Sequence, residues 1–268
     1  MIIDTIHGIV SNSNPHYFVH RNLLDAELFS AYLKNRSTRY LPLEYVLQGK
    51  GEALTIDDSI FAAAAAARQA RKYGHSVTLF LNGYNIETGQ PYFFSRLNVA
   101  LDTRTVDTAV FENSSYELRD LATVERFREA VKRQLARMGD EDQRQEFVTE
   151  ICGLLKASGS QVPPYLVPIS RGEVHELASL GVDIQNHGWT HSRGGSLAPD
   201  RHAEDIRRGR QWIKEVCNSE AQFFAIPNGD GLPPKVESRD YDEWFLLTGS
   251  KPEGRIERGL INRRTLVL

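Results

Sequence analysis

The sequence predicts an α/β protein in which parallel strands alternate with helices. A strand-helix-strand unit occupies residues 52–81, and the same alternation resumes from residue 170. Length alone allows one large barrel or two small domains. Because no internal repeat or low-complexity linker interrupts the 268 residues, we expect a single domain over residues 1–268.

The strand-helix-strand unit is well defined by its composition. Residues 52–57 form a short apolar strand, and residues 59–73 are rich in alanine, which has the highest helix propensity. Basic residues in the last turn suit the helix dipole, and Gly74 ends the helix. Residues 76–81 are β-branched and aromatic, as in a buried strand. This order predicts parallel strands joined by a right-handed crossover.

The remaining elements follow from the same signals. Residues 84–168 are charged and helical in pattern, so we expect a helical insertion inside the domain, with helices at 123–138 and 142–156. Elsewhere we expect helices at 24–33, 170–180 and 202–216, strands at 1–10, 182–185, 222–226, 245–248 and 265–268, and a turn at 227–231.

Composition excludes several classes of function. The formal net charge is −3, with both signs mixed along the chain, so no basic tract indicates a nucleic-acid partner. Cys152 and Cys217 lie far apart, and we expect both to be buried free thiols. No apolar run reaches the roughly 20 residues needed to span a bilayer, and residues 1–10 lack the features of a signal peptide. We therefore expect a cytoplasmic enzyme, and the sequence leaves its oligomeric state open.

Polar residues follow three of the predicted strands. Asp57 and Asp58 end the first strand of the strand-helix-strand unit, and His187 and His191 follow the strand at 182–185. The turn at 227–231 follows a third strand. Because the carboxyl ends of parallel strands converge on one face, where active sites are built, we expect these residues to meet in one cleft.

The two histidines are spaced four residues apart, as in His-Gly-Trp-Thr-His. A zincin helix has this spacing, but the glutamate beside the first histidine is missing and Gly188 weakens a helix. A bent loop can still bring His187 and His191 to one ion. The alternative, two histidines that only form hydrogen bonds within a loop, stays open for the pair taken alone.

The aspartate pair also has two interpretations. One of the two could cap the helix that follows, since its first N–H groups need acceptors. Adjacent carboxylates repel each other unless a cation lies nearby, however, so Asp57 and Asp58 together indicate a metal site. Two imidazoles and a carboxylate suit one divalent ion, with zinc the first choice and cobalt, manganese, nickel or iron as others. The ion would lower the pKa of a bound water, and the second aspartate would remove its proton.

Three segments resemble the motif regions of the polysaccharide deacetylase (NodB-homology) family. Ala-Leu-Thr-Ile-Asp-Asp-Ser at 53–59, with the following helix and the strand at 77–83, is similar to the first motif. Residues 181–191 look like the second motif, and Phe-Phe-Ala-Ile-Pro-Asn-Gly at 223–229 looks like the third. The resemblance covers roughly the whole chain, and it implies a distorted (β/α) barrel, usually seven-stranded, and N-deacetylation of amino sugars.

The resemblance also implies roles for individual residues. Asp57 would be the catalytic base, and Asp58, His187 and His191 would hold the metal ion. Around them, Trp189 could stack on a sugar or fill the loop, and Pro227 and Asn228 could contact substrate or only form the turn.

The chain departs from the family pattern at three places. Ser59 replaces the usual glycine, Ala225 stands where many members carry an arginine that orients the base, and no Leu-x-His element supplies a general acid near the C-terminus. Candidate replacements for the arginine are Arg193, Arg263 and Arg264. For each of the three we expect a solvated surface position.

Three functions remain open at this stage. The first is a metal-dependent hydrolase that removes an N-acyl group, acetyl in the first instance, from an amino sugar or related small metabolite. The second is a non-catalytic carbohydrate-binding or scaffold protein that kept the fold and lost the general acid. The third is a non-haem iron oxygenase, although the order of its ligands and the α/β pattern speak against it.

Overall fold

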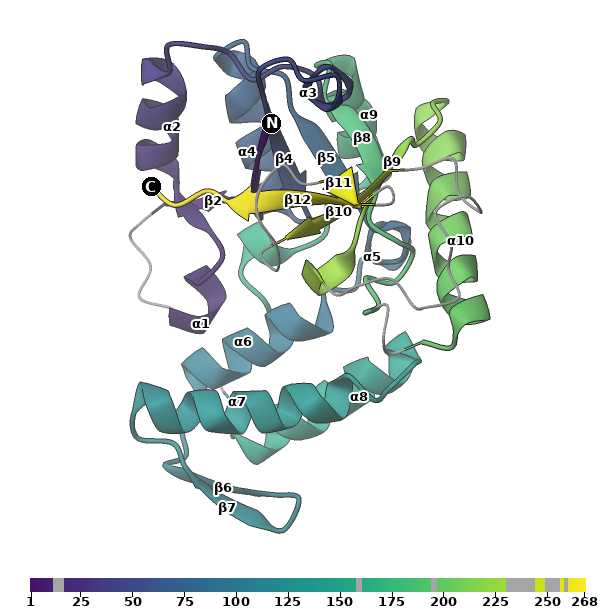
Figure 1. Ribbon diagram of the computed structural model, residues 1–268. Coiled ribbons are helices and arrows are strands. Elements are labelled where there is room, and N and C mark those ends of the chain that lie inside the picture. The colour runs from purple at the N-terminus through teal and green to yellow at the C-terminus, as the bar shows by residue number, and fades with distance from the viewer. Residues whose placement is uncertain (12–16, 158–160, 194–196, 230–243, 249–255, 258–259) are drawn as a thin grey trace. The chain divides into compact units, whose positions relative to one another are not determined.

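The computed structural model describes residues 1–11, 17–157, 161–193, 197–229, 244–248, 256–257 and 260–268 (Figure 1). The chain divides into two compact units. The first comprises the described residues among 1–14, 22–90 and 167–268, and the second comprises the described residues among 15–21 and 91–166. Each unit has its own hydrophobic core, so each is described by itself.

The first unit is a parallel barrel. Its strands, in spatial order, are β1 (Ile2–Ile6), β4 (Glu52–Asp57), β5 (Thr78–Leu81), β8 (Asp183–Asn186), β9 (Phe223–Ala225), β10 (Trp244–Thr248) and β12 (Leu260–Thr265). Each pairs with its neighbour in parallel, and β1 pairs with β12, so these seven strands close a ring. The short strand β11 (Ile256–Glu257) runs antiparallel to β12. The predicted (β/α)7 barrel is therefore confirmed.

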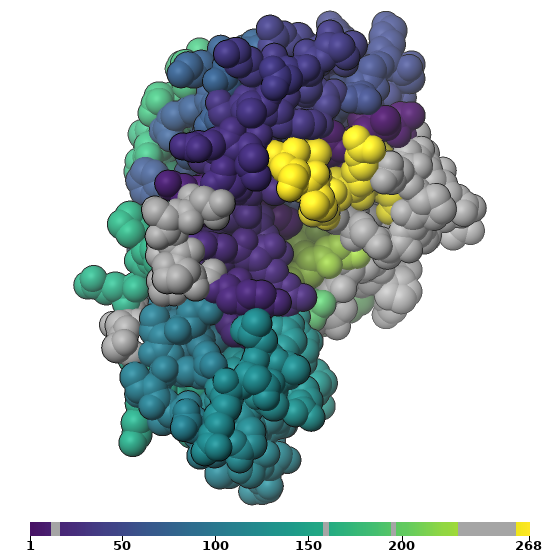
Figure 2. Space-filling view, turned by 90° about the vertical axis from the view of Figure 1, so that its left-hand side faces the viewer, coloured from purple at the N-terminus to yellow at the C-terminus, as the bar shows by residue number. Residues whose placement is uncertain are grey.

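The ring closes through a narrow seam between β1 and β12. Only two residue pairs join these strands, Asp4 with Arg264 and Thr5 with Thr265, whereas five pairs join β1 to β4. The N–H of Leu266 adds a hydrogen bond to the Thr5 carbonyl. Figure 2 shows the consequence at the surface, where the C-terminal residues (yellow) lie against the N-terminal segment (purple).

The last strand begins earlier than its apolar residues suggest. The prediction of a strand at 265–268 was wrong, because β12 ends at Thr265 and the chain beyond it is not a strand. Val267 is 83% exposed, so the apolar ending of the sequence does not mark a core strand. The strand residues are instead Leu-Ile-Asn-Arg-Arg-Thr, in which charge hides the strand pattern.

Helices and a small parallel sheet cover the barrel. They are β2 (Ile9–Val10), β3 (Leu24–Asp25), α2 (Ala26–Asn35), α3 (Leu43–Leu47), α4 (Phe61–Lys72), α5 (Gly83–Thr88), α9 (Arg171–Ser179) and α10 (Pro199–Cys217). The alanines of α4 are almost all buried, because short side chains let this helix approach the sheet closely. As predicted, α4 ends at a glycine in the left-handed region, Gly74 with φ +75°.

The second unit is mainly helical. It contains α1 (Tyr17–His20), α6 (Phe93–Thr103), β6 (Thr108–Phe111), β7 (Ser114–Glu117), α7 (Leu121–Leu135), α8 (Glu141–Leu154) and the 3-10 turn η1 (Pro164–Leu166). Both predicted helices are present as α7 and α8, and Val124, Phe127 and Val131, which recur at helix spacing on α7, lie in the core of this unit. The hairpin β6–β7 was not predicted. Its signal is the pair Glu112-Asn113, both with positive φ, between two short strands.

The two cysteines and the hydropathy of the helices were also the subject of predictions. Cys152 and Cys217 are free thiols, as expected, but each is partly exposed instead of fully buried. In the part of the chain that the structure describes, no helix is long and apolar enough to cross a membrane.

Candidate metal centre

The carboxyl ends of two barrel strands, β4 and β8, bring the predicted residues together. β4 ends at Asp57, with Asp58 directly after it, and β8 leads into residues 187–191, here called the histidine loop. Oδ1 of Asp58 lies 3.3 Å from Nε2 of His191 and 3.7 Å from Nε2 of His187. All three side chains are buried, and one ligand atom from each lies within 4.8 Å of the others. The convergence expected from the strand order therefore occurs.

The cluster fits a divalent cation by two tests. Oδ1 of Asp58 is buried without a hydrogen-bond partner among the described residues, which is costly unless something else binds it. Tetrahedral zinc, with ligand bonds of about 2.0–2.2 Å, separates its ligand atoms by roughly 3.3–3.6 Å. The two separations from Oδ1 of Asp58, 3.3 and 3.7 Å, are close to that range. The donor set of two imidazoles and one carboxylate also suits other divalent transition metals.

Backbone contacts orient His187 for this role. Its Nδ1 lies 2.7 Å from the carbonyl oxygen of Ala225 at the end of β9, so Nδ1–H donates there and Nε2 faces Asp58. Burial lowers the pKa of His187 to about 4, which keeps the imidazole neutral, as a metal ligand must be. Ala225, which lacks the family's arginine side chain, thus contributes through its carbonyl.

Asp57 is held by an arginine from the other end of the sequence. Arg263 on β12 donates from both terminal nitrogens to the two carboxylate oxygens of Asp57, each at 2.7 Å, and also to Oγ1 of Thr55 at 3.1 Å. Burial alone would raise the pKa of Asp57, but the charge and hydrogen bonds of Arg263 outweigh it and lower that pKa. Asp57 is therefore ionised at neutral pH.

The expectation of a solvated surface arginine was wrong for Arg263, whose side chain is fully buried. Successive residues of a strand point to opposite faces, so Arg263 points toward Asp57 while Arg264 pairs with Asp4 on the other side. Arg193 is partly buried. Sequence alone could not choose among the three, because the choice depends on the register of β12 against β1 and β10.

Neither aspartate caps the following helix. The N-cap of α4 is Ile60, and no side chain accepts a hydrogen bond there. Asp58 instead adopts a left-handed backbone with φ +78°, as does His191 with φ +53°. Such conformations are costly for residues other than glycine and are found where surrounding contacts fix them, often at functional sites.

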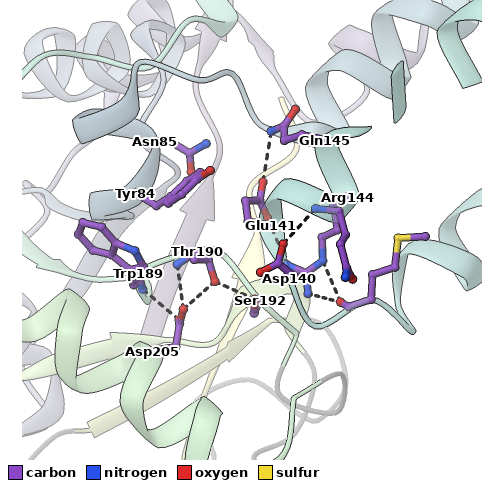
Figure 3. Close-up of polar contacts among 12 residues, drawn as sticks. Tyr84, Asn85, Asp140, Glu141, Arg144, Gln145, Trp189, Thr190, Ser192 and Asp205 are labelled. Atoms are coloured by element: carbon purple, nitrogen blue, oxygen red, sulfur yellow. Dashed lines mark hydrogen bonds and ion pairs between the residues drawn. The ribbon is translucent and has the colours of Figure 1, made fainter. Parts of the chain in front are cut away.

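The histidine loop packs around Trp189, which is 8% exposed. A Cβ on Gly83 would lie 2.4 Å from the Trp189 ring, the ring of Tyr84 meets it edge-on at 6.3 Å, and the guanidinium of Arg208 lies 3.9 Å from the ring centre. Figure 3 shows Tyr84 and Trp189 side by side. These contacts match the loop-filling interpretation, and substrate stacking by Trp189 stays a prediction.

The third predicted region is the turn after β9. Pro227 is buried and Asn228 is exposed with φ +62°, both within the 3-10 turn η3 (Pro227–Gly229). Substrate contact by these two residues stays a prediction. The rest of the predicted turn, Asp230 and Gly231, lies outside the described residues.

Ser59 takes the place of the family's glycine and makes specific contacts. Its Oγ accepts a hydrogen bond from the N–H of Asn82 at 2.7 Å and donates to the Asn82 carbonyl at 3.2 Å. The Asn82 side chain in turn donates to the carbonyls of His187 and Gly188. Ser59 therefore links the end of β4, through Asn82, to the histidine loop.

His7 was missed by the sequence reasoning. It directly follows β1, and because Ile6 pairs with Ile56, His7 stands level with Asp57 on the adjacent strand. Its charge contributes to lowering the pKa of Asp57 and of Asp58 against the opposing effect of burial. No motif marks a single histidine, but the rule that selected the other strand ends would also have selected this one.

Comparisons with known proteins agree with this geometry. The family model described as polysaccharide deacetylase matches residues 47–239. A comparison with curated proteins finds no match. Among solved structures, the Streptococcus pyogenes deacetylase PplD in complex with acetate is similar with a TM-score of 0.62 and 14% identity, over 100% of this chain and 92% of that one.

Two other structures show the same fold. IcaB from Ammonifex degensii has a TM-score of 0.59 and 14% identity, over 99% of this chain and 91% of that chain. A de-N-acetylase from Aggregatibacter actinomycetemcomitans has a TM-score of 0.55 and 12% identity, over 99% and 94%. At these identities the likeness establishes the fold, while the family rests on the match to residues 47–239.

Proposed function

Because the chain belongs to the polysaccharide deacetylase family, we propose that it is a metal-dependent hydrolase that removes an N-acyl group, acetyl in the first instance, from an amino sugar. The observation that carries this proposal is the buried cluster of Asp58, His187 and His191 beside an ionised Asp57. We place zinc first among the candidate ions, since the ligand separations suit tetrahedral coordination.

Asp58, His187 and His191 would hold the ion in this proposal. A divalent cation bound there would supply Lewis acidity, both to activate water and to polarise the acyl oxygen. Asp57 accepts the proton of the attacking water, because Arg263 keeps it ionised and fixes both of its oxygens. Arg263 therefore takes the orienting role that Ala225 cannot fill.

The amine that leaves must gain a proton, and His7 is the candidate donor. It stands at the end of β1, level with Asp57, and supplies the histidine that the C-terminal segment lacks. Replacing His7 by glutamine is expected to lower kcat by about 10²–10⁴, the usual range for general acid-base catalysis, without loss of bound metal. An unchanged kcat would remove His7 from the mechanism.

We also propose that the substrate is a small acylated amino sugar or related metabolite. We propose a cytoplasmic location together with this substrate. PplD is described as a deacetylase and the Aggregatibacter actinomycetemcomitans protein as a de-N-acetylase, which supports the reaction type but not the size of the substrate. A panel that contains both monosaccharides and oligosaccharides with N-acetyl groups decides this point.

The test combines metal analysis with acetate release. Purified protein is expected to contain one divalent ion per chain and to release acetate from at least one N-acetylated sugar. Asp57→Asn should abolish turnover and keep the metal, whereas Asp58→Asn should lose the metal. Equal metal loss in both variants would contradict the assigned roles.

Two other outcomes would favour the alternative functions. Bound metal without hydrolysis of any substrate would favour a non-catalytic carbohydrate-binding protein, and oxygen uptake with ferrous ion would favour an oxygenase.

A further inference from the structure

A carboxylate outside the metal cluster holds the segment between the two histidines. Asp205 lies on α10, which runs along β8 (Figure 1). Its Oδ2 accepts a hydrogen bond from the N–H of Trp189 at 3.0 Å, and its Oδ1 accepts from the N–H of Thr190 at 3.0 Å. Oγ1 of Thr190 donates to the same Oδ1 at 2.6 Å. Figure 3 shows these three contacts converging on Asp205.

The start of the histidine loop is tied to the same helix. Asn186 donates from Nδ2 to the carbonyl of Ile206 on α10 at 3.0 Å, and its Oδ1 accepts from the N–H of Gly188 at 2.9 Å. A Cβ on Gly209 would lie 2.4 Å from Oδ1 of Asn186 and 2.9 Å from the Gly188 carbonyl carbon, so helix and loop touch without a gap. α10 therefore acts as a rigid support for the loop.

The loop needs such support because its backbone is not in a relaxed conformation. Gly188 has φ +84°, which glycine adopts freely, but His191 has φ +53°, which is costly for a residue with a Cβ. Hydrogen bonds to an ionised carboxylate are roughly twice as strong as neutral ones. By accepting from two successive N–H groups and a hydroxyl, Asp205 fixes Trp189 and Thr190, and with them the spacing of the flanking imidazoles.

We infer that Asp205 is a positioning residue for the metal centre, setting the separation of His187 and His191 without touching the ion. This inference rests on the proposed metal-dependent function. It predicts that the carboxylate of Asp205 determines metal affinity, since supporting residues of this kind typically change affinity by about 10–100-fold when they are altered. Asp205 lies outside the three segments that resemble the family motifs, and it is not one of the three proposed metal ligands.

The experiment titrates metal-stripped protein with Zn²⁺ alone and measures Kd by competition with a chelator. Asp205→Asn keeps the size of the side chain and removes its charge and one acceptor, and it is expected to weaken Zn²⁺ binding by about 10–100-fold. The matched control is Glu204→Gln, an exposed neighbour that pairs only on the surface with Arg207 and should change Kd less than about twofold.

Loss of fold must be separated from loss of positioning. Ile213→Val on the same helix removes one buried methylene and is expected to cost about 0.5–1.5 kcal/mol of stability with no change in Zn²⁺ affinity. The Co²⁺-loaded Asp205→Asn protein should show an altered visible absorption spectrum, which reports ligand geometry, whereas the Ile213→Val protein should not.

The outcomes distinguish the two levels of proposal. Wild-type affinity and an unchanged Co²⁺ spectrum in Asp205→Asn would overturn the positioning role. Equal weakening of Zn²⁺ binding in Asp205→Asn and Ile213→Val would also overturn it, because general destabilisation would then explain the effect. If the wild-type protein itself binds neither Zn²⁺ nor Co²⁺, the proposed metal-dependent function is contradicted, and the positioning role with it.

Discussion

The two sides of the site are held by different kinds of force. On the strand side, Asp57 and Arg263 form a buried ion pair between residues 206 positions apart in the sequence. On the loop side, His187 and His191 lie four positions apart; the residues between them donate hydrogen bonds to Asp205, and His187 donates to the Ala225 carbonyl. The strand side depends on the pairing of two opposite, buried charges, and the loop side depends on the geometry of its hydrogen bonds. Single substitutions should therefore damage them to different degrees and under different conditions.

The largest effect is expected from breaking the strand side. Arg263→Gln leaves Asp57 buried without its cation, and breaking such a pair costs about 3–5 kcal/mol. Urea unfolding monitored by circular dichroism measures the loss. The double variant Asp57→Asn with Arg263→Gln should recover part of it, because no unpaired charge remains. A loss below about 1 kcal/mol in the single variant would show that the pair is not the anchor described here.

Acidification should separate the two sides in metal-free protein. The folded-state pKa of His187 is about 4, below its ordinary value, so the unfolded chain binds more protons between about pH 6.5 and 4. Stability should therefore fall as pH decreases through this window, by up to about 3 kcal/mol for this group. Asp57, with its lowered pKa, keeps its contribution throughout that window and loses it only below about pH 4.

A second buried imidazole, that of His202, is expected to contribute to the loss of stability in the same pH window, so its contribution must be measured separately. Burial lowers the pKa of His202 on α10 to about 4, and both of its ring nitrogens lack a hydrogen-bond partner among the residues that can be described. His202→Phe should reduce the stability lost between pH 6.5 and 4, while the exposed His175→Gln should leave it unchanged. Identical pH profiles for wild type and His202→Phe would contradict the assignment.

A smaller effect is expected from crowding the loop side. Gly209→Ala places a methyl group 2.4 Å from Oδ1 of Asn186, so helix α10 or the loop must shift. Overpacking of this kind costs about 1–3 kcal/mol. Gly153→Ala is the matched control, because a Cβ there meets nothing within 4 Å and alanine favours a helix. Thermal unfolding should show a lower Tm for the first variant only.

The smallest effect is expected at the link between the two sides. Ser59→Gly introduces the family's usual residue and removes one hydroxyl that both donates to and accepts from the backbone of Asn82, for a net loss of about 0.5–1.5 kcal/mol. Chemical denaturation should detect the loss, and metal content should stay at the wild-type level. Loss of metal in this variant would show that the strand and loop sides are coupled more tightly than their contacts indicate.

These contrasts also explain what the sequence could predict. Asp57, Asp58, His187 and His191 were found because each belongs to a short local pattern at a strand end. The parallel strands followed from the alternation of strands and helices, which is likewise local, whereas the barrel was implied by the family resemblance. Arg263 could not be selected over Arg264, because the face to which each points is set by pairing with β1, a strand about 260 residues away.

Other features were missed for a related reason. Asp205 lies within a charged helix where nothing distinguishes it from Glu204, and only the fold places it against the histidine loop. In the hairpin β6–β7, β6 is Thr-Ala-Val-Phe and β7 is Ser-Ser-Tyr-Glu, so neither strand has the alternation of apolar and polar residues that marks a half-buried strand. The residues proposed to carry the chemistry could be identified from their neighbours in sequence. The residues that position them could be identified only from contacts in the fold.

The narrow seam between β1 and β12 has a consequence for how the chain folds during its synthesis. Contacts between the first and last strands have the greatest sequence separation in the fold, so they form late and at a high entropic cost. During synthesis on the ribosome, Asp57 emerges some 200 residues before its partner, Arg263. The nascent chain therefore carries an unneutralised acid in its future interior until Arg263 has been synthesised, and a product truncated before β12 lacks both the strand that closes the ring and the cation that pairs with Asp57.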